Sequence, residues 1–563
     1  MTPETKICQN CKGDFIIEPD DFSFYEKIGV PAPTFCPDCR YQRRISDRNE
    51  WDLYRRNCSK CLNPMVSIYN PEYSGPVYCT KCWWSDDWDR FQYGCDFDFS
   101  KTFFEQFKDL RERTPKVSVA HFRCVNSDYT NQSQDLKNCY MVFGSDASED
   151  SMYGSLYGKS RECIDCNSIL SCELLYECIF CTKCSNSAYL DNCTDCFNSY
   201  FLKDCKGCND CFGSVNLRNK SYYWFNEQLT KEEYQKRLSE FKYTRSEIDM
   251  VLKKHIELAL SLPTKYYVGQ KILNSNGSYL ENLKNSQDCF CVFDTEDSSY
   301  CQDAWYMKNC LDVTEMAYNE LDYEMEGVGY SARSIGCSRS WNIFDCKYVE
   351  NCFSCDSIFG CVALNKNKYC ILNKQYSKEE YEILIRKIID HMKEGGEWGE
   401  FFPTKISPFA YNETVAQHYY PMTKEEVLSK GWRWYNRDAR SYVVTMSHEN
   451  IPQSIKETDE SILNEIISCK SQDSDVEKKK HTACATAFKI TSEELLLHKK
   501  INVPLPEQCF PCRFRDRLNK RTPRKLWHRT CMKDGCENEF ETSYAPERPE
   551  IVYCEKCYQQ EVI

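Results

Sequence analysis

"ECIDCNSILSCELLYECIFCTKC", residues 162–184, places six cysteines in 23 residues and at first resembles a row of zinc knuckles. The stretch belongs to a longer lattice between residues 128 and 217. Written in rows of 15, its small or apolar residues fall at columns 3, 6, 9, 12 and 15. Fixed-period self-similarity is typical of a solenoid, and the Asn, Asp, Ser and Gly between the columns favour β-coils over helix pairs. We therefore predict a mainly β fold with short helices, built on a Cys-rich β-solenoid with 15-residue coils.

The sequence itself tests whether these cysteines bind metal, because residues 128–217 recur at an offset of 147. "LKNC" (136–139) corresponds to "LKNS" (283–286), and "NEQLTKEEY" (226–234) corresponds to "NKQYSKEEY" (373–381). Two cysteine series run at 15-residue spacing: Cys163, Cys178, Cys193 and Cys208, and Cys166, Cys181, Cys196 and Cys211. The second series corresponds to Val313, Val328, Ile343 and Ile358 in the sister copy. Valine cannot bind metal, whereas buried cysteine behaves as a small hydrophobe, so we interpret these columns as core. Metal held between adjacent CxxC coils stays open as the alternative.

Both ends of the chain carry paired cysteine motifs that do have zinc-ligand spacing. Two pairs of soft ligands on separate turns supply the tetrahedron that zinc prefers. The C-terminal sets repeat the internal lengths of the N-terminal ones, and "VYCTKC" recurs as "VYCEKC". The predicted ligands are Cys8, Cys11, Cys36 and Cys39; Cys58, Cys61, Cys79 and Cys82; His481, Cys484, Cys509 and Cys512; and Cys531, Cys536, Cys554 and Cys557. We predict about four structural zinc ions, because closed ligand sets stabilise folds and leave no position for substrate. Sequential and cross-braced pairing both remain open.

The stretch "CQNCKGDFIIEPDDFSFYEKIGVPAPTFCPDCRYQRR" (8–44) resembles a zinc-ribbon module that recurs in uncharacterised proteins of small-genome candidate-phylum bacteria. Residues 509–531 and 407–426 resemble the same multi-zinc-ribbon family. Some of these proteins carry a CaiB/BaiF CoA-transferase label, which no residue of this sequence supports. The resemblance implies an architecture and zinc, and it implies no activity.

Helix signals connect these parts. Thr230-x-x-Glu233 and Ser377-x-x-Glu380 are capping boxes, which predict helices over 231–241 and 378–392. Further helices are expected at 100–113, 246–261 and 461–469. The predicted segments are zinc ribbons at 1–48 and 49–95, a helical connector at 96–127, solenoid copy 1 at 128–217, a helical segment at 218–274, solenoid copy 2 at 275–364, a helical segment at 365–395, an irregular aromatic connector at 396–474, and zinc ribbons at 475–522 and 523–563.

Charge and missing motifs limit the function. The net charge is −13, yet windows 36–60 and 509–533 together carry +11, so an anionic partner would be met near the two ends. No phosphate loop, nucleophile elbow or HExxH motif occurs, although an enzyme without a recognisable motif stays open. Without an apolar membrane span or a signal-type segment, we expect a cytoplasmic protein with reduced thiols and no membrane or small-molecule partner.

Two functions fit these features. The first is a zinc-stabilised, non-catalytic scaffold that presents the zinc ribbons and a solenoid surface to a protein partner. The alternative is nucleic-acid binding, most simply of RNA, with Phe514 or Trp527 stacking on bases and arginines contacting phosphates. The basic candidates are Arg40, Arg43, Arg44, Arg48, Arg513, Arg515, Arg517, Arg521, Arg524, Lys525 and Arg529. The competing interpretation is that these arginines pair with carboxylates of the same chain.

Overall fold

The computed structural model describes residues 2–437, 442–473 and 483–562, which form two compact units with more strand than helix. Unit 1 consists of residues 1–120 and 269–436, and unit 2 of residues 121–268 and 437–563. The segments of the two units therefore alternate along the chain. Unit 1 combines the N-terminal cysteine motifs with the second copy of the repeat, and unit 2 combines the first copy with the C-terminal motifs.

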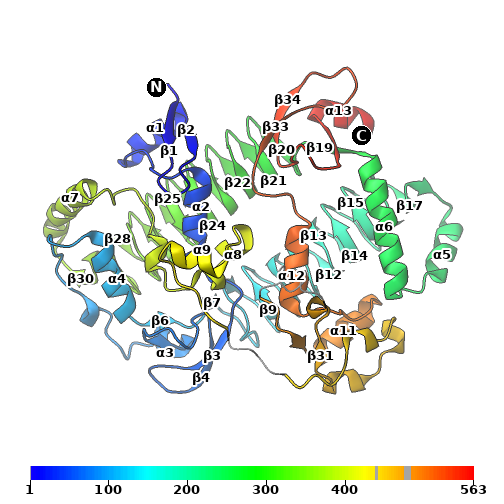
Figure 1. The fold of residues 1–563 in the computed structure, drawn as a ribbon, viewed down its shortest axis with the longest axis horizontal. Coiled ribbons are helices and arrows are strands. Elements are labelled where there is room, and N and C mark those ends of the chain that lie inside the picture. Colours follow the sequence, from blue (N-terminus) through cyan, green and yellow to red (C-terminus); the bar gives the residue numbers. More distant parts are fainter. Residues whose placement is uncertain (1, 438–441, 474–482, 563) are drawn as a thin grey trace. The chain divides into compact units, whose positions relative to one another are not determined.

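Unit 1 contains an 11-stranded, mainly parallel sheet, together with short hairpins and helices (Figure 1). Its N-terminal elements are β1 (Glu4–Ile7), β2 (Asp14–Ile17), α1 (Pro19–Ile28), α2 (Pro37–Ile45), β3 (Tyr54–Asn57), β4 (Pro64–Ser67), β5 (Val77–Tyr78), α3 (Thr80–Trp84), η1 (Phe91–Tyr93), α4 (Phe103–Arg113) and β6 (Lys116–Val117). The sheet comprises β20 (Gly269–Leu273), β21 (Gly277–Lys284), β22 (Cys289–Glu296), β23 (Gln302–Lys308), β24 (Leu311–Glu320), β25 (Tyr323–Glu326), β26 (Gly329–Ala332), β27 (Trp341–Phe344), β28 (Asp356–Phe359), β29 (Lys368–Ile371) and β30 (Lys374–Gln375). It is followed by α7 (Lys378–Glu394), η2 (Thr404–Ile406), η3 (Tyr411–Glu413), α8 (Ala416–Tyr419) and α9 (Lys424–Ser429).

Unit 2 has the same components in the opposite order along the chain. Its strands begin with β7 (His121–Phe122), β8 (Ser133–Gln134), β9 (Tyr140–Phe143), β10 (Met152–Gly158), β11 (Asn167–Leu170), β12 (Glu173–Tyr176), β13 (Ile179–Thr182), β14 (Ser185–Asp191), β15 (Tyr200–Lys203), β16 (Asn209–Phe212), β17 (Ser221–Trp224) and β18 (Glu227–Gln228). Next come α5 (Lys231–Glu240), α6 (Arg245–Ser261), β19 (Pro263–Lys265), η4 (His448–Asn450), η5 (Ile455–Glu457), η6 (Glu460–Asn464), β31 (Ile467–Ser468) and η7 (Lys470–Gln472). The C-terminal elements are β32 (Ala487–Phe488), α11 (Ser492–Ile501), α12 (Phe510–Asn519), β33 (Trp527–Thr530), β34 (Glu539–Thr542), β35 (Ile551–Tyr553) and α13 (Glu555–Val562).

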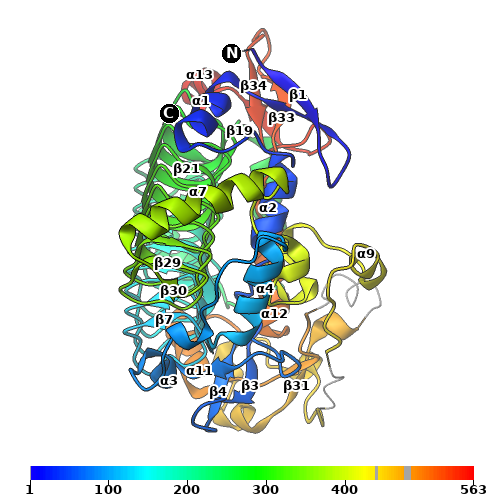
Figure 2. The same cartoon turned by 90° about the vertical axis from the view of Figure 1, so that its left-hand side faces the viewer.

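The chain returns beside itself every 12 residues, and the predicted 15-residue coil is wrong. Met152 pairs in parallel with Ile164, and Ile164 with Tyr176. The same offset joins Gln302 to Thr314 in the second copy. Figure 2 shows the resulting strands stacked one above another. We call residues 121–228 coil block 1 and residues 269–375 coil block 2.

A triplet pattern explains both the 12-residue coil and the misleading 15-residue lattice. Within the coils nearly every third residue has φ between about +45° and +63°, for example Glu162, Asp165 and Ser168. This left-handed conformation turns the chain, and Asn and Asp tolerate it better than most residues. The residue after most of these turns, such as Cys163 or Cys166, points inward and is buried. Both 12 and 15 are multiples of three, so the inward pattern alone does not fix the length of a coil.

The inward cysteines form the core of coil block 1, as the comparison of the two copies predicts. Because the true offset is 12, the cysteines of adjacent coils are Cys172, Cys184, Cys196 and Cys208, all buried. The Cys172 thiol donates to the carbonyl of Leu170, two residues back (3.4 Å), and Ser160 makes the same bond to Gly158 (2.9 Å). A small side chain with a donor therefore suits these positions. Among the residues that the structure describes, the coils contain no three metal-ligating groups within 4.8 Å of one another.

The helix predictions at 100–113, 231–241, 246–261 and 378–392 correspond to α4, α5, α6 and α7. The Thr230 and Ser377 hydroxyls accept from the backbone N–H of Glu233 and Glu380. The expected helix at 461–469 is wrong, because η6 is a 3-10 turn that leads into β31. Helices α2 and α12 were not predicted, although both start within a CxxC motif.

Asp322 lies in the core of coil block 2, at the position that Leu175 occupies in coil block 1. Burial raises the pKa of its carboxyl to about 7. Its carboxyl accepts from the Asn319 amide (2.6 Å) and from the Ser334 backbone N–H (2.8 Å). In the unfolded chain the pKa lies near 3.8. Ionisation above pH 4 therefore costs the folded state more than the unfolded one.

We predict that this carboxyl lowers the free energy of unfolding of unit 1 as pH rises from about 4 to 7, by at most about 4 kcal/mol. The Asp322→Leu variant should lose this penalty, so its stability advantage over the wild type should grow across that range. Denaturant unfolding of both proteins at several pH values measures the difference. A difference that does not change with pH would contradict the assignment.

Candidate metal centres and their docking contacts

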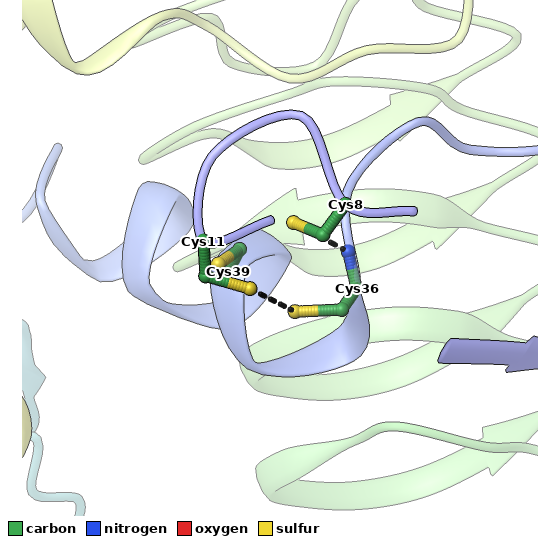
Figure 3. Close-up of side chains that lie close together, drawn as sticks. All are labelled: Cys8, Cys11, Cys36 and Cys39. Carbon is green, nitrogen blue, oxygen red and sulfur yellow. Dashed lines mark hydrogen bonds between the residues drawn. The ribbon is translucent and has the colours of Figure 1, made fainter. Parts of the chain in front are cut away.

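The first cysteine cluster joins a hairpin turn to the start of a helix. Cys8 and Cys11 lie on the turn between β1 and β2, where Lys12 takes a left-handed φ of 65°. Cys36 is the N-cap of α2, and Cys39 lies in its first turn. Figure 3 shows the four side chains converging, with 3.8 Å between the Cys11 and Cys36 sulfurs. All four sulfurs lie within 4.8 Å of one another, which fits the closed tetrahedral set of a thiolate-bound metal.

Four groups of this kind occur among the described residues, and in each the second cysteine pair starts a helix. In three of them the first pair lies on a hairpin turn, whereas in the third group Cys469 follows β31 and Cys484 precedes β32. The predicted zinc ribbons, with ligands on two hairpin turns, are therefore corrected to one hairpin turn plus one helix start. The four groups are Cys8, Cys11, Cys36 and Cys39; Cys58, Cys61, Cys79 and Cys82; Cys469, Cys484, Cys509 and Cys512; and Cys531, Cys536, Cys554 and Cys557. The ligands group sequentially, which answers the question of cross-bracing. We call each group with its hairpin and helix a metal module.

One backbone hydrogen bond identifies equivalent cysteines in the four modules. The sulfur of the first cysteine accepts the N–H of the third, as from Cys36 to Cys8 (3.3 Å). The bond recurs from Cys79 to Cys58 (3.2 Å), from Cys509 to Cys469 (3.3 Å) and from Cys554 to Cys531 (3.3 Å). N–H donors and the positive end of a helix both favour thiolate over thiol. The donor set is therefore built for a soft cation.

Cys469 occupies the position expected for His481. It lies 3.9 Å from the Cys512 sulfur and completes a set of four thiols with Cys484 and Cys509. His481 lies outside the described residues. The sequence analysis missed Cys469 because 14 residues separate it from Cys484, whereas the matching N-terminal pair is separated by two. The sequence does offer one signal for Cys469: it is a cysteine close before Cys484 that belongs to no CxxC pair.

The thiols of the first module lie close enough to shift one another's pKa. A hydrogen bond from Cys36 lowers the pKa of Cys39 to about 5, while the pKa of Cys36 is raised by the same contact and by burial. Asn10 also donates its amide to Cys39 (3.3 Å). A divalent metal would replace the shared protons and remove the repulsion between thiolates.

The helix of the first module carries arginines that dock it on coil block 2. Arg40 Nε donates to Asp312 Oδ2 (2.8 Å), and Arg44 Nη1 contacts Asp312 (3.0 Å) and Glu324 (2.9 Å). Asp312 and Glu324 are 12 residues apart, so they lie on adjacent coils. Both arginines and both acids are buried. The Tyr300 hydroxyl adds a hydrogen bond to Asp21 of α1 (3.0 Å).

Unit 2 repeats this docking contact by contact. Arg513 and Arg517 correspond to Arg40 and Arg44, and Asp165 and Glu177 correspond to Asp312 and Glu324. Arg517 Nη1 lies 2.8 Å from Asp165 and 2.9 Å from Glu177, and Arg513 Nε lies 3.2 Å from Asp165. Tyr153 bonds Glu494 at 3.0 Å, as Tyr300 bonds Asp21. The duplication therefore preserves a complete ionic contact between a metal module and a coil block, which we call the docking cluster.

Unit 1 extends its docking cluster along the coils. Arg48 contacts Glu326 (2.8 Å) and Glu315. Further along, Glu350 receives Arg111, Arg339 (2.9 Å) and Lys116 (3.1 Å). Burial disfavours the Glu350 carboxylate, but these three cations lower its pKa overall. Burial also lowers the pKa of Lys116 to about 8.

The docking clusters account for six of the eleven basic residues that the sequence offers for nucleic-acid binding. Arg40, Arg43, Arg44, Arg48, Arg513 and Arg517 are buried against carboxylates of the same chain, so they do not fit contact with an external phosphate. Phe514 is also buried. The rest are less enclosed: Arg521 donates to Asn167 (3.2 Å), Arg529 to the Tyr544 carbonyl (3.3 Å), Lys525 lies over Trp527, and Arg515 and Arg524 are half-buried.

The chain matches no protein-family model, and no curated protein shows significant similarity to it. The described part of the chain contains no helix that is both long and apolar enough to cross a membrane. The function must therefore be argued from the metal modules, the docking clusters and the coil surfaces.

The third metal module yields a prediction about stoichiometry. Purified wild-type protein should hold about four zinc ions per chain, Cys469→Ser should hold about three, and His481→Ala should keep four. Replacing one of four thiolates weakens a structural zinc site, whereas a residue outside the set leaves it unchanged. Elemental analysis of the full chain gives the counts. Loss of one zinc in His481→Ala with retention in Cys469→Ser would reverse the assignment.

The docking clusters yield a prediction about stability. Arg44→Met leaves Asp312 and Glu324 buried with fewer partners and should destabilise unit 1 by about 3 to 5 kcal/mol. Arg517→Met should do the same in unit 2. Hydrogen exchange followed by mass spectrometry should show faster exchange in the coil block of the altered unit only.

Arg161→Met removes an exposed pair with Glu173 and serves as the control, with an expected cost below about 1 kcal/mol. Equal effects of Arg44→Met and Arg161→Met would show that burial of the docking cluster contributes nothing.

Proposed function

We propose that the chain is a zinc-stabilised, non-catalytic scaffold in which the two coil blocks are β-solenoids and each is locked to a pair of metal modules. The observation that carries the proposal is the docking cluster, conserved between the two units in residue type and contact. An arginine such as Arg44 that is buried between two carboxylates serves assembly, because it is not available to a ligand. The 12-residue parallel register supports the solenoid assignment.

Zinc is the metal that the modules fit best in this proposal. Four cysteine sulfurs within 4.8 Å of one another match its preference for tetrahedral thiolate sites. Each module fixes the N-terminus of a helix, and α2 and α12 then carry the docking arginines. Zinc would thus hold the helices in the position from which they reach the coils. The cysteines are free thiols, which supports a reducing compartment such as the cytoplasm.

A scaffold of this kind acts through extended outer surfaces of its coils. The faces that carry the docking clusters are covered, and α5, α6 and α7 also pack against the coils, so a macromolecular partner would use the faces that stay exposed. The family resemblance of residues 8–44 is consistent with this proposal, because it too implies an architecture without an activity.

A measurement of RNA binding distinguishes the scaffold function from the alternative, nucleic-acid binding. Full-length, zinc-loaded protein is titrated with labelled single-stranded RNA of mixed sequence between about 50 and 200 mM salt. The scaffold proposal expects no binding with a steep salt dependence, because most candidate arginines are neutralised within the chain. Tight binding that weakens sharply with salt, and that Arg524→Ala with Lys525→Ala abolishes, would replace the scaffold with a nucleic-acid binding function.

A further inference from the structure

An exposed aromatic strip distinguishes coil block 2 from coil block 1. Tyr306, Tyr318 and Tyr330 lie on successive coils and are 49%, 48% and 44% exposed. Their rings stack at centroid distances of 4.7 Å for each neighbouring pair, with interplanar angles of 12° and 16°. We call these three residues the tyrosine strip. Contiguous exposed aromatic surface marks interaction sites more often than isolated apolar residues do.

Tryptophans border the strip in the neighbouring ladder. Trp305 pairs with Ala317, Ala317 with Gly329, and Gly329 with Trp341. Trp341 packs against Tyr330 edge-on at 5.3 Å, and Trp305 stacks on Phe293 at 5.7 Å. The two small residues therefore lie between two large rings, and the tyrosines form one side of this row.

Comparison of the copies shows that folding does not require the strip. At the offset of 147, Tyr306, Tyr318 and Tyr330 correspond to Lys159, Ser171 and Lys183 of coil block 1. The docking cluster is retained between the same copies, so the two blocks share their buried contacts and differ on this face. Because the buried contacts are shared and these exposed residues differ, we infer that the tyrosines serve binding by coil block 2 alone.

We propose that the tyrosine strip binds a proline-rich peptide in the polyproline II conformation, with a lysine or arginine at the end near Tyr306. This inference rests on the scaffold function and names the partner class. A polyproline II helix repeats every three residues, or about 9.3 Å along its axis. The rings of Tyr306 and Tyr330 are two stacking distances apart, about 9.4 Å in total. Prolines three residues apart in the peptide would therefore each contact one of these two rings.

The chemistry of the strip matches this ligand. Polyproline II carbonyls make no internal hydrogen bonds, and phenol hydroxyls are donors that can reach them. Aromatic surfaces recognise proline-rich segments because the ligand is already ordered before it binds. Nucleic acid is disfavoured at the Tyr306 end, because the exposed Asp294 carboxylate lies one coil away.

The charge near Tyr306 sets the direction of the peptide. Asp294 occupies the coil before Tyr306 and is exposed, accepting from Asn282 (2.7 Å). Asp297 accepts from Asn285 (2.9 Å). Asp294 has a neutral donor in this contact, whereas Asp297 also interacts with the Lys284 ammonium, so a cationic peptide end adds an attraction mainly at Asp294. A basic residue beside the proline segment is therefore part of the proposal.

The test uses the full zinc-loaded chain and a fluorescein-labelled peptide of one lysine followed by nine prolines. We expect saturable binding in the micromolar range by fluorescence anisotropy and at least about 10-fold weaker binding by Tyr318→Ser. Tyr330→Phe, which keeps the ring stack, should bind several-fold more weakly through loss of its hydroxyl. Asp294→Asn should weaken the lysine peptide and leave a nonaproline without lysine unchanged.

Phe197→Ser, which alters an exposed aromatic of coil block 1, is the control and should bind as the wild type does. The proposal is overturned by absence of saturable binding, by equal binding of a glycine-serine peptide of the same length, or by unchanged binding in Tyr318→Ser. Binding of RNA or an oligosaccharide at the strip in place of the proline peptide would also overturn it. Failure of the peptide without salt-dependent RNA binding leaves the scaffold function standing.

Discussion

The structure depends on arginines that are buried between carboxylates of adjacent coils. Taking Arg44, Asp312 and Glu324 out of water is costly, and the cost is offset only when the charges meet in good geometry. Such a contact specifies position more than it adds stability, because a displaced arginine leaves buried charge without a partner. The docking cluster therefore fixes which coils each metal module contacts.

The metal modules supply the arginines of the docking cluster, and the coils supply its carboxylates. Two adjacent coils of each block supply one acid each, Asp312 and Glu324 or Asp165 and Glu177, because a 12-residue repeat places equivalent positions one above another. The module supplies two arginines four residues apart on one face of a helix, Arg40 and Arg44 or Arg513 and Arg517. Two of the four cysteines lie at the start of that helix, so the cysteine cluster and the docking arginines are on the same element.

Much of this architecture is visible in the sequence, and the missing parts have definite physical reasons. Cysteine pairs two residues apart are local signals, so the sequence predicts most of the cysteines that cluster in the structure, and the comparison of the copies predicts that the coil cysteines are buried. The 12-residue coil was missed because backbone hydrogen bonds set the register, and side chains at every third residue are compatible with several coil lengths. Cys163, for example, is followed one coil later by Leu175 and not by another cysteine. Asp312 and Arg40 are 272 residues apart, so only the repeated acids at positions 165 and 312 could have indicated their role.

The alternation of segments along the chain has a consequence for biosynthesis. The acids of coil block 1 are made long before the arginines that neutralise them, since Glu177 and Arg517 are separated by 340 residues. During translation the N-terminal module must likewise wait for coil block 2. Contacts between such distant segments form slowly and leave incomplete surfaces exposed in the meantime. A nascent chain of this protein thus holds the unpaired acids of coil block 1 until α12 of the third metal module emerges, and a chain that ends earlier would keep them unpaired.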